Sequence, residues 1–530
     1  MRIAALSSAF AVSLYAVGVH AAPALDTDQL VYQSTASSGL EALTFGLSSK
    51  LSSVFSNALS HLPSPVAAIE GEGRTIWDVI NDSDEFSQLA HVLNYSSDAT
   101  KDILKKKQGL TLFAPLNWHH QRDGGDKEAF QALSFGPASL QEWNNIQKQI
   151  ADYERDYCVR ARHHKDKGGK DDDDDDEKKR RREFLRHLID ATALYHLVRS
   201  DTVLDAKAIA DNSSVATWLN TGKSHSSNNG TDWRVRTGKS LLPLPAVYLN
   251  FYSRVVKPDI RTKNGLIHGI KYPLFLPPDV LQSLFFGQTT FSTTTSALQK
   301  VHAAKYLTYR PRHSHYSHHG GRGGKHAPGS IDAWHHKSNG STFAGVSAET
   351  VFVPTNLAWS RLPFAFRAYL FSPWGYHLLQ KILMLHSLPS DIVYADFVHH
   401  VPHSGKAVRE AVHTTTDEFG HANKTSYTFD TVLPAIDGKK GEFETLDVDV
   451  YRYYLLPRQK GPLQTRIVVQ NVSVILQDIP ASNGVWHSVP FLLKPKGHPH
   501  KGVWAEVAAA AEEAGFGMVD LNAEAQANLW

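Results

Sequence analysis

Cysteine is almost absent from this chain, because Cys158 is the only one among 530 residues. No internal disulfide can form, so the stability of the fold must come from packed hydrophobic cores. An excess of charge of one sign is also lacking, since 55 Lys and Arg nearly balance 53 Asp and Glu. A formal net charge of +2 argues against nucleic acid as a partner.

Long apolar runs are scarce as well. After residue 22, no stretch approaches the roughly 20 uninterrupted apolar residues that a transmembrane helix needs, so we predict no transmembrane segment. The chain ends LNAEAQANLW, which lacks the hydrophobic tail of a lipid-anchor signal.

Catalytic motifs are lacking too. The sequence contains no G-x-S-x-G elbow and no H-E-x-x-H zinc motif. The tripeptides at 222–224 and 238–240 read Gly-Lys-Ser but have no upstream glycine of a phosphate-binding loop. With 29 His in the chain, pairs of His with Asp or Ser arise by chance. We therefore predict that the protein is not an enzyme and needs no metal or other cofactor.

The N-terminus has the pattern of a secretory signal peptide over residues 1–21. Arg2 supplies the charge, residues 3–19 are apolar, and Ala21 ends a small-residue cleavage site. A Ser- and Ala-rich leader follows over 22–70. Seven Asn-x-Ser/Thr sequons fit a glycosylated protein of the secretory pathway: Asn81, Asn94, Asn212, Asn229, Asn339, Asn423 and Asn471.

A segment near the middle of the chain is repeated 219 residues later, as 258–277 and 477–495. In both copies an Asp-Ile pair stands five residues before an Asn-Gly pair, and a His follows that Asn by four. Asn-Gly favours a type I′ hairpin turn, because both central residues of that turn need positive φ. The repeated spacing predicts two copies of one domain. His268 and His487, the two histidines, are expected to be buried and hydrogen-bonded to backbone.

A second pair of segments precedes the first in each copy. Residues 111–118 and 350–357 share the pattern Thr-x-Phe-x-Pro-x-Asn, which predicts a buried strand that ends in a turn. Asn117 and Asn356 are expected to cap or hydrogen-bond that turn. Together the two pairs resemble the signatures of fasciclin-like domains. The resemblance covers roughly residues 71–277 and 279–495 and implies an α+β fold: two tandem wedges, each a β-sandwich with packed helices.

Four segments interrupt or follow the two domains. Residues 121–183 include the run KDKGGKDDDDDDEKKRRR, which contains no apolar residue to bury and is therefore expected to be a solvated linker. The alternatives are a site of protease processing and a site that binds a metal ion or a polyanion. Residues 310–337 form a loop rich in His and Gly that could bind metal or respond to pH. We also expect a loop over 402–441 and a tail over 496–530 with a short helix.

Ordinary secondary structure is expected around the signatures. Thr75 should cap a first helix, with Asp78 completing a capping box. A helix over 184–198 should carry Tyr195 and His196, and a helix over 376–387 should carry His386. Strands are expected over 233–236, 247–256, 447–456 and 465–476.

Partner binding in fasciclin-like domains is associated with the Asp-Ile pair and with a Tyr-His pair between the signatures. By that resemblance, the binding candidates are Asp259, Ile260, Tyr195, His196, Asp478, Ile479 and His386, with Leu385 in place of the second Tyr. The implied function is non-enzymatic adhesion, secreted or at the cell wall, to surface or matrix proteins, to glycans or to further copies of the chain. The alternative is a luminal protein of the vacuole that acts in membrane trafficking or autophagy.

Overall fold

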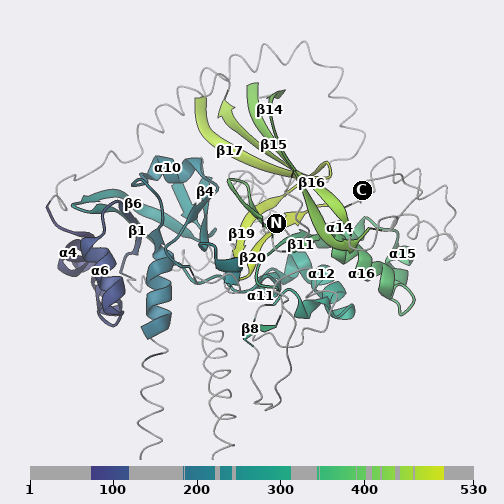
Figure 1. Cartoon of the computed structure of the whole chain (residues 1–530), viewed down its shortest axis with the longest axis horizontal. Coiled ribbons are helices and arrows are strands. Elements are labelled where there is room, and N and C mark those ends of the chain that lie inside the picture. The colour runs from purple at the N-terminus through teal and green to yellow at the C-terminus, as the bar shows by residue number, and fades with distance from the viewer. Residues whose placement is uncertain are drawn as a thin grey trace, which may run out of the picture.

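The computed structural model shows two units along one chain, a first unit within residues 73–277 and a second unit within 279–493 (Figure 1). The described residues are 73–117, 183, 186–220, 227–240, 246–308, 310–311, 343–344, 346–389, 391–400, 409–417, 420–435, 442–456 and 460–493. The signal peptide, the leader, most of both insertions and the tail, which are predictions from sequence, lie outside these residues.

The first unit begins with a group of short helices: α4 (Ile76–Asp82), η1 (Asp84–Phe86), α5 (Ser87–Asn94) and α6 (Asp98–Lys106). Thr75 caps α4, and the predicted capping box is confirmed, since the Asp78 side chain accepts from the Thr75 backbone in return. Ile76, Ile80 and Phe86 face inward and pack on Leu104 and the neighbouring strand. These helices therefore close one face of the sheet.

The sheet of the first unit has seven strands in the order β2-β1-β7-β6-β5-β4-β3. The strands are β1 (Leu110–Pro115), β2 (Leu197–Val198), β3 (Ser214–Ala216), β4 (Arg234–Ser240), β5 (Ala246–Leu249), β6 (Ser253–Thr262) and β7 (Gly265–Ile270). The strand predicted over 247–256 is in fact two, because Asn250 and Phe251 turn the chain with positive φ. A helix over 186–196, α10 (Ala206–Asp211) and η2 (Ser227–Gly230) complete the unit.

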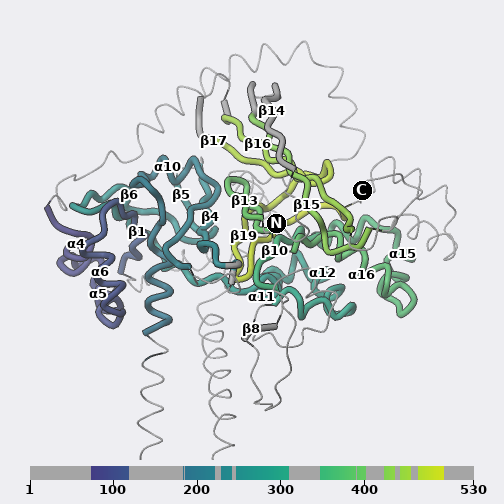
Figure 2. The backbone as a smooth tube through the Cα atoms, in the orientation of Figure 1, coloured from purple at the N-terminus to yellow at the C-terminus, as the bar shows by residue number. Residues whose placement is uncertain are grey.

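The second unit starts with helices again: α11 (Val280–Phe286), α12 (Gln288–Lys300), η3 (Ala303–Lys305), α14 (Asn356–Ser360), α15 (Phe364–Leu370) and α16 (Tyr376–Leu385). Asp279 caps α11 directly after the first unit ends, so no linker separates the two units. In Figure 2 the first unit, purple to teal, lies on the left, and the label of α11, the first helix of the second unit, stands near the centre.

The strands of the second unit form two larger sheets. One has the order β11-β10-β20-β19, and the other runs β14-β15-β16-β17-β18. The strands are β10 (Glu349–Pro354), β11 (Ser387–Pro389), β14 (Arg409–Asp417), β15 (Gly420–Pro434), β16 (Phe443–Leu456), β17 (Lys460–Val469), β18 (Val472–Ser473), β19 (Leu476–Ala481) and β20 (Gly484–Val489). Two hairpins remain, β12 (Asp391–Tyr394) with β13 (Phe397–His400) and β8 (Arg310–Pro311) with β9 (Phe343–Ala344).

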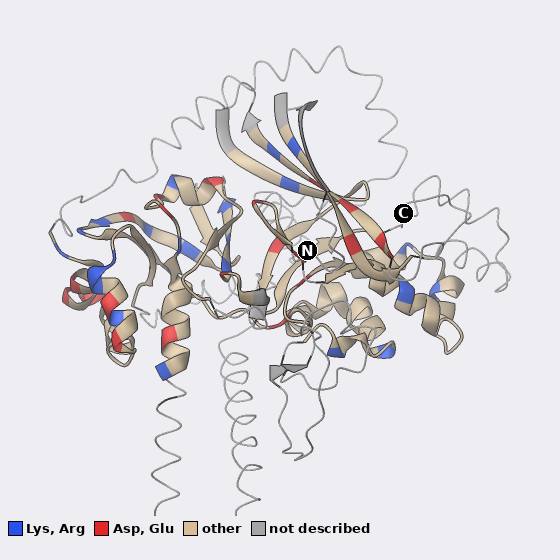
Figure 3. Ribbon diagram, in the orientation of Figure 1, with Lys and Arg blue, Asp and Glu red and all other residues tan. Residues whose placement is uncertain are grey.

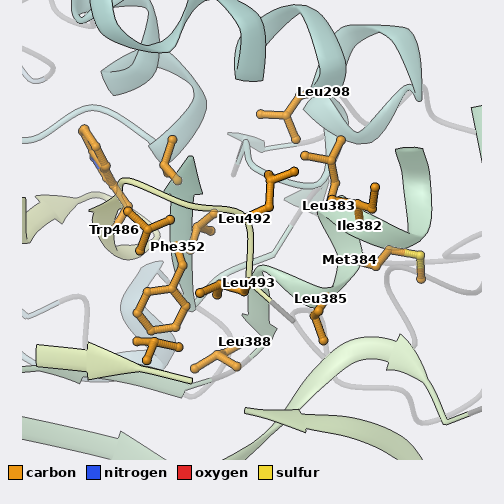
Figure 4. Close-up of a cluster of buried hydrophobic side chains, with 14 of the residues drawn as sticks. Leu298, Phe352, Ile382, Leu383, Met384, Leu385, Leu388, Trp486, Leu492 and Leu493 are labelled. Atoms are coloured by element: carbon orange, nitrogen blue, oxygen red, sulfur yellow. The ribbon is translucent and has the colours of Figure 1, made fainter. Parts of the chain in front are cut away.

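One continuous hydrophobic core joins the helices and both larger sheets of the second unit. Figure 4 shows Leu383 and Leu385 of the α16 helix beside Phe352, Leu492 and Leu493. The core also reaches Phe429 and Leu446 on the five-stranded sheet. Packing of sheets and helices on one core confirms the predicted α+β class.

Two local predictions were wrong. The strands β14 and β15 pair with each other within the expected loop over 402–441, because their several Thr residues suit strands. The Asn-Gly pairs do not form type I′ turns: Thr262 pairs with Gly265, so Lys263 and Asn264 are the loop residues. The Asn264 side chain is used instead, since it accepts from Ile76 N at the start of α4 and donates to Leu104 O.

Candidate functional site: buried histidines and the interface between the units

The two sequence signatures meet in space in both units. β1 runs parallel to β7 with Phe113 opposite His268, and β10 runs parallel to β20 with Phe352 opposite His487. The two alignments have the same register from end to end, as expected for two copies of one framework. The signatures therefore form the centre of each sheet.

Each Asp-Ile pair lies at a β-bulge in the strand before the hairpin. Asp259 and Asp478 have φ of 59° and 62°, a left-handed conformation that Asp tolerates better than most residues. Asp259 Oδ1 accepts from Ala206 N at the start of α10, and Asp478 Oδ1 accepts from Ala395 N, both at 2.9 Å. The carboxylates thus hold neighbouring loops against the bulge.

His268 and His487 connect the bulge to a strand or loop behind it, which confirms the expectation that they are buried and bonded to backbone. Nδ1 of His487 accepts from Asp478 N at 3.1 Å, and its Nε2 donates to Val393 O at 2.8 Å. His268 makes the same two contacts, with Asp259 N and Leu204 O. Burial lowers the pKa of His487 to about 4, so the ring is neutral.

His196 and His386 form a second matched pair. His196 Nδ1 donates to Thr192 O and its Nε2 accepts from Leu274 N, the residue that closes the first unit. His386 does the same with Ile382 O and Leu493 N. Burial lowers the pKa of both rings to about 4. Each histidine therefore fastens the end of its unit to a helix.

The hairpin β12–β13 of the second unit docks on the first unit through its turn residue, Asp396. The Asp396 carboxylate accepts from the backbone N of Ser213 and Ser214 at 3.0 and 2.7 Å and from Ser214 Oγ at 2.5 Å. Arg234 lies 3.7 Å from the same carboxylate and 4.4 Å above the ring of Phe397. Both carboxylate oxygens of Asp396 thus accept hydrogen bonds from the first unit. This contact of Asp396 with Ser213, Ser214 and Arg234 is called the plug below.

A second basic residue, Arg236, lies beside this plug. Its Nε donates to Gln477 O at 2.9 Å, and its guanidinium lies 3.9 Å over the Phe251 ring. Burial raises the pKa of the Asp478 carboxyl to about 7, and the charge of Asp396 acts in the same direction. Burial also lowers the pKa of Arg236 to about 10. The interface therefore encloses charge that water screens poorly.

Further backbone contacts fix the two units to each other. Asn228 N donates to Ser347 O at 2.7 Å, and Lys239 Nζ donates to Leu463 O. Ser482 N donates to the carbonyl of Pro278, which stands at the junction between the units. The two units therefore contact each other at several separate places.

The seven binding candidates occupy mostly interior positions. Asp259 and Ile260 are half-buried, and the other five are buried: Tyr195, His196, Asp478, Ile479 and His386. The Tyr195 hydroxyl donates to Arg234 O and accepts from Asn250, directly behind the interface strand β4. The structure therefore brings Tyr195 and Asp478 to the same interface, whereas Asp259 binds the start of α10 within the first unit. Their role in binding a partner stays a prediction.

The residues that form the hydrogen bonds of the plug were not among the candidates derived from the sequence. Asp396 and Ser214 are 182 positions apart and belong to no motif, so no local spacing relates them. Asn117 and Asn356 also differ from expectation. They bind the backbone of an earlier helix, Gln88 N and Thr293 N, rather than the turn that follows them.

The sequons lie at different kinds of position. Asn81, Asn94, Asn423 and Asn471 are exposed. Asn212 is half-buried next to the plug, and its side-chain amide donates to Ala208 O at 3.0 Å. Nothing is described for the side chains of Asn229 and Asn339, and glycosylation of all seven stays a prediction.

The described part of the chain contains neither a metal-ligand cluster nor a membrane-spanning helix. No group of three or more His, Cys, Asp or Glu is placed to hold a metal ion there. None of the helices described is long and apolar enough to cross a membrane. The His- and Gly-rich segment over 312–337 lies outside the described residues.

Comparison with known proteins identifies the second unit. Residues 338–495 match the family model of the fasciclin domain. The first unit repeats the same strand pairing and the same His contacts. Among solved structures, the chain is similar to a domain pair from the insect cell adhesion molecule fasciclin I. That match has 14% identity and a TM-score of 0.26, and it covers 78% of this chain and 97% of the other. No curated protein matches the chain.

Proposed function

We propose that the chain is a non-enzymatic adhesion protein that acts outside the cell or at the cell wall. The observation that carries the proposal is the fasciclin domain at 338–495, docked on a first unit built on the same framework. Two related units held at a fixed spacing can engage two sites at once, which raises the effective concentration of the second contact. The partners would be surface or matrix proteins, glycans or other copies of the chain.

Attachment of chain-coated beads to cells tests the adhesion itself. Asp259→Asn keeps the Oδ1 acceptor for Ala206 N but removes a charge on a side chain that is 31% exposed. We expect this variant to lower attachment. The matched change Asp478→Asn, in the buried copy, should leave attachment unchanged. If the wild-type chain attaches no better than uncoated beads, the proposed function is wrong. Equal attachment of all three proteins would show that Asp259 takes no part in the contact with cells.

Localisation separates the proposed setting from the vacuolar alternative. A tag placed within residues 165–178 can be followed in culture medium, cell wall and vacuole fractions. Medium or wall would support adhesion, and the vacuole lumen would favour the role in trafficking. Recovery in the cytosol would contradict the predicted signal peptide.

A further inference from the structure

Three large hydrophobic side chains are exposed on one helical corner of the second unit. Trp374 is 80% exposed, Phe364 is 78% exposed and Leu357 is 54% exposed. They lie on α14, on α15 and in the short turn after α15, at the end of the molecule away from the first unit (Figure 1). Trp374 and Phe364 are the most exposed large hydrophobic residues in the described part of the chain.

The fold holds these side chains outward rather than leaving them loose. Gly375 packs so closely on the end of α15 that a Cβ there would stand 2.2 Å from Tyr369 O. Ser372 N donates to that same carbonyl oxygen at 2.9 Å. Trp374 is therefore fixed beside the C-terminal end of α15, and Phe364 begins the same helix. Seven helical residues span about 10 Å, so Phe364 and Trp374 flank one short helix.

The helices of this corner carry charges of one sign. Residues 350–390 contain no Asp or Glu, although Arg361, Arg367 and Lys381 lie among them. In Figure 3 the helices α14, α15 and α16 show Lys and Arg but no acidic residue. Arg367 lies 5.8 Å from the Phe364 ring, and Arg361 lies 3.8 Å from the Phe491 ring. Cations and exposed aromatics are thus mixed on one corner.

We propose that this corner, defined by Leu357, Phe364 and Trp374 with Arg361, Arg367 and Lys381, docks on the surface of an anionic lipid bilayer. Trp and Phe rings favour the boundary between headgroups and acyl chains. Arg and Lys can cover apolar surface with their stems while their charges meet lipid phosphates. Because residues 350–390 contain no Asp or Glu, the helices α14, α15 and α16 do not themselves repel an anionic surface.

Such docking would be weak and reversible, because three side chains and a few cations bury little compared with a spanning helix. It should also weaken with salt, since part of the attraction is electrostatic. The inference is independent of the proposed adhesion. A chain that fails to attach to cells could still bind vesicles, and the reverse holds as well.

Co-sedimentation of the full chain with vesicles tests the proposal. The vesicles contain phosphatidylcholine with or without phosphatidylserine. We expect binding to the mixed vesicles, and at least a roughly tenfold loss of binding in the double variant Phe364→Ser with Trp374→Ser. Tyr95→Ser removes an aromatic ring that is 61% exposed in the first unit and serves as the matched control, with no loss expected. Melting curves establish that each variant is folded.

Arg367→Gln tests the electrostatic part, and it should reduce binding to the mixed vesicles only. The proposal is overturned if the wild-type chain binds neither vesicle or if the double variant binds as well as the wild type. Equal binding with and without phosphatidylserine would overturn the anionic preference. A lipid-free dimer that the double variant abolishes would show that the corner joins two copies instead.

Discussion

Glu349 is a fully buried carboxylic acid at the start of β10, and the first unit has Leu110 at the matching position. Its Oε1 accepts from Asn483 at 3.0 Å. Burial raises the pKa of Glu349 well above its usual value, and the charge of Asp279 adds to the effect. The second unit therefore carries an acid where its relative is apolar.

We predict that Glu349→Leu raises the free energy of unfolding by about 1–3 kcal/mol at neutral pH, because it removes a buried group that is costly to ionise. Glu349→Gln keeps an oxygen that can accept from Asn483, so we expect a smaller rise in the free energy of unfolding than for Glu349→Leu. The folded-state pKa is raised, so the unfolded chain ionises first once pH exceeds about 4.5 and the wild type loses stability from there upward. Denaturant unfolding at several pH values measures this. A gain that does not grow with pH would contradict the assignment.

The buried histidines act in the opposite direction to such acids. With a folded-state pKa of about 4, His196, His386 and His487 contribute stability that is lost as pH falls from about 6.5 to 4. Carboxyl groups with a raised pKa, such as Asp478, act the other way: as pH falls within this range, they stabilise the folded protein relative to the unfolded chain. The two sets of groups therefore oppose each other in mildly acidic solution.

The parallel pairing of β1 with β7, and of β10 with β20, depends on two glycines. A Cβ on Gly265 would stand 2.0 Å from Leu110 O, and one on Gly484 would stand 1.9 Å from Glu349 O. We predict that Gly265→Ala lowers the free energy of unfolding by more than about 3 kcal/mol or prevents folding, because the strands must separate. Gly109→Ala is the control.

Gly109 has φ of +76° and open space around it, so an alanine there meets backbone strain alone. Its cost should stay at about 1–2 kcal/mol. Denaturant unfolding compares the two. Equal losses would show that close approach of the strands is not what requires glycine at 265.

The elements differ in how well sequence predicts them. The Thr-x-Phe-x-Pro-x-Asn segments and the Asp-Ile to Asn-Gly spacing identify the central strands, because buried strands and tight hairpins leave local patterns. The hairpin β14–β15 was missed because its Thr-rich strands are interrupted by polar residues and resemble a loop. The site was predicted least well, since the plug joins Asp396 to Ser214 across 182 residues. Burial of the Asp478 carboxylate also follows from packing between the units, which no short segment encodes.

At the scale of the whole molecule, the plug decides whether the two units behave as one body. We predict that Asp396→Ala lets them unfold in two separate thermal transitions, whereas the wild type shows one, because the carboxylate links Ser213, Ser214 and Arg234 to the second unit. Differential scanning calorimetry distinguishes these outcomes, and small-angle scattering should show a larger radius of gyration.

Asp232→Ala provides the matched control, since that carboxylate binds Arg199 and Asn220 within the first unit only. This variant should lower the stability of the first unit, while the two units still unfold in a single thermal transition. A single transition in Asp396→Ala, at an unchanged radius of gyration, would mean that the remaining contacts hold the units together unaided.

The distance between Ser214 and its plug along the chain has a consequence for biosynthesis. A ribosome that adds about 5–20 residues per second needs roughly 10–40 s to make the 182 residues from Ser214 to Asp396. During that interval Arg234 lacks the Asp396 carboxylate, and the backbone N–H groups of Ser213 and Ser214 lack their later acceptor. A first unit that folds during synthesis therefore exposes to solvent, for that time, polar groups that the finished protein covers with its second unit.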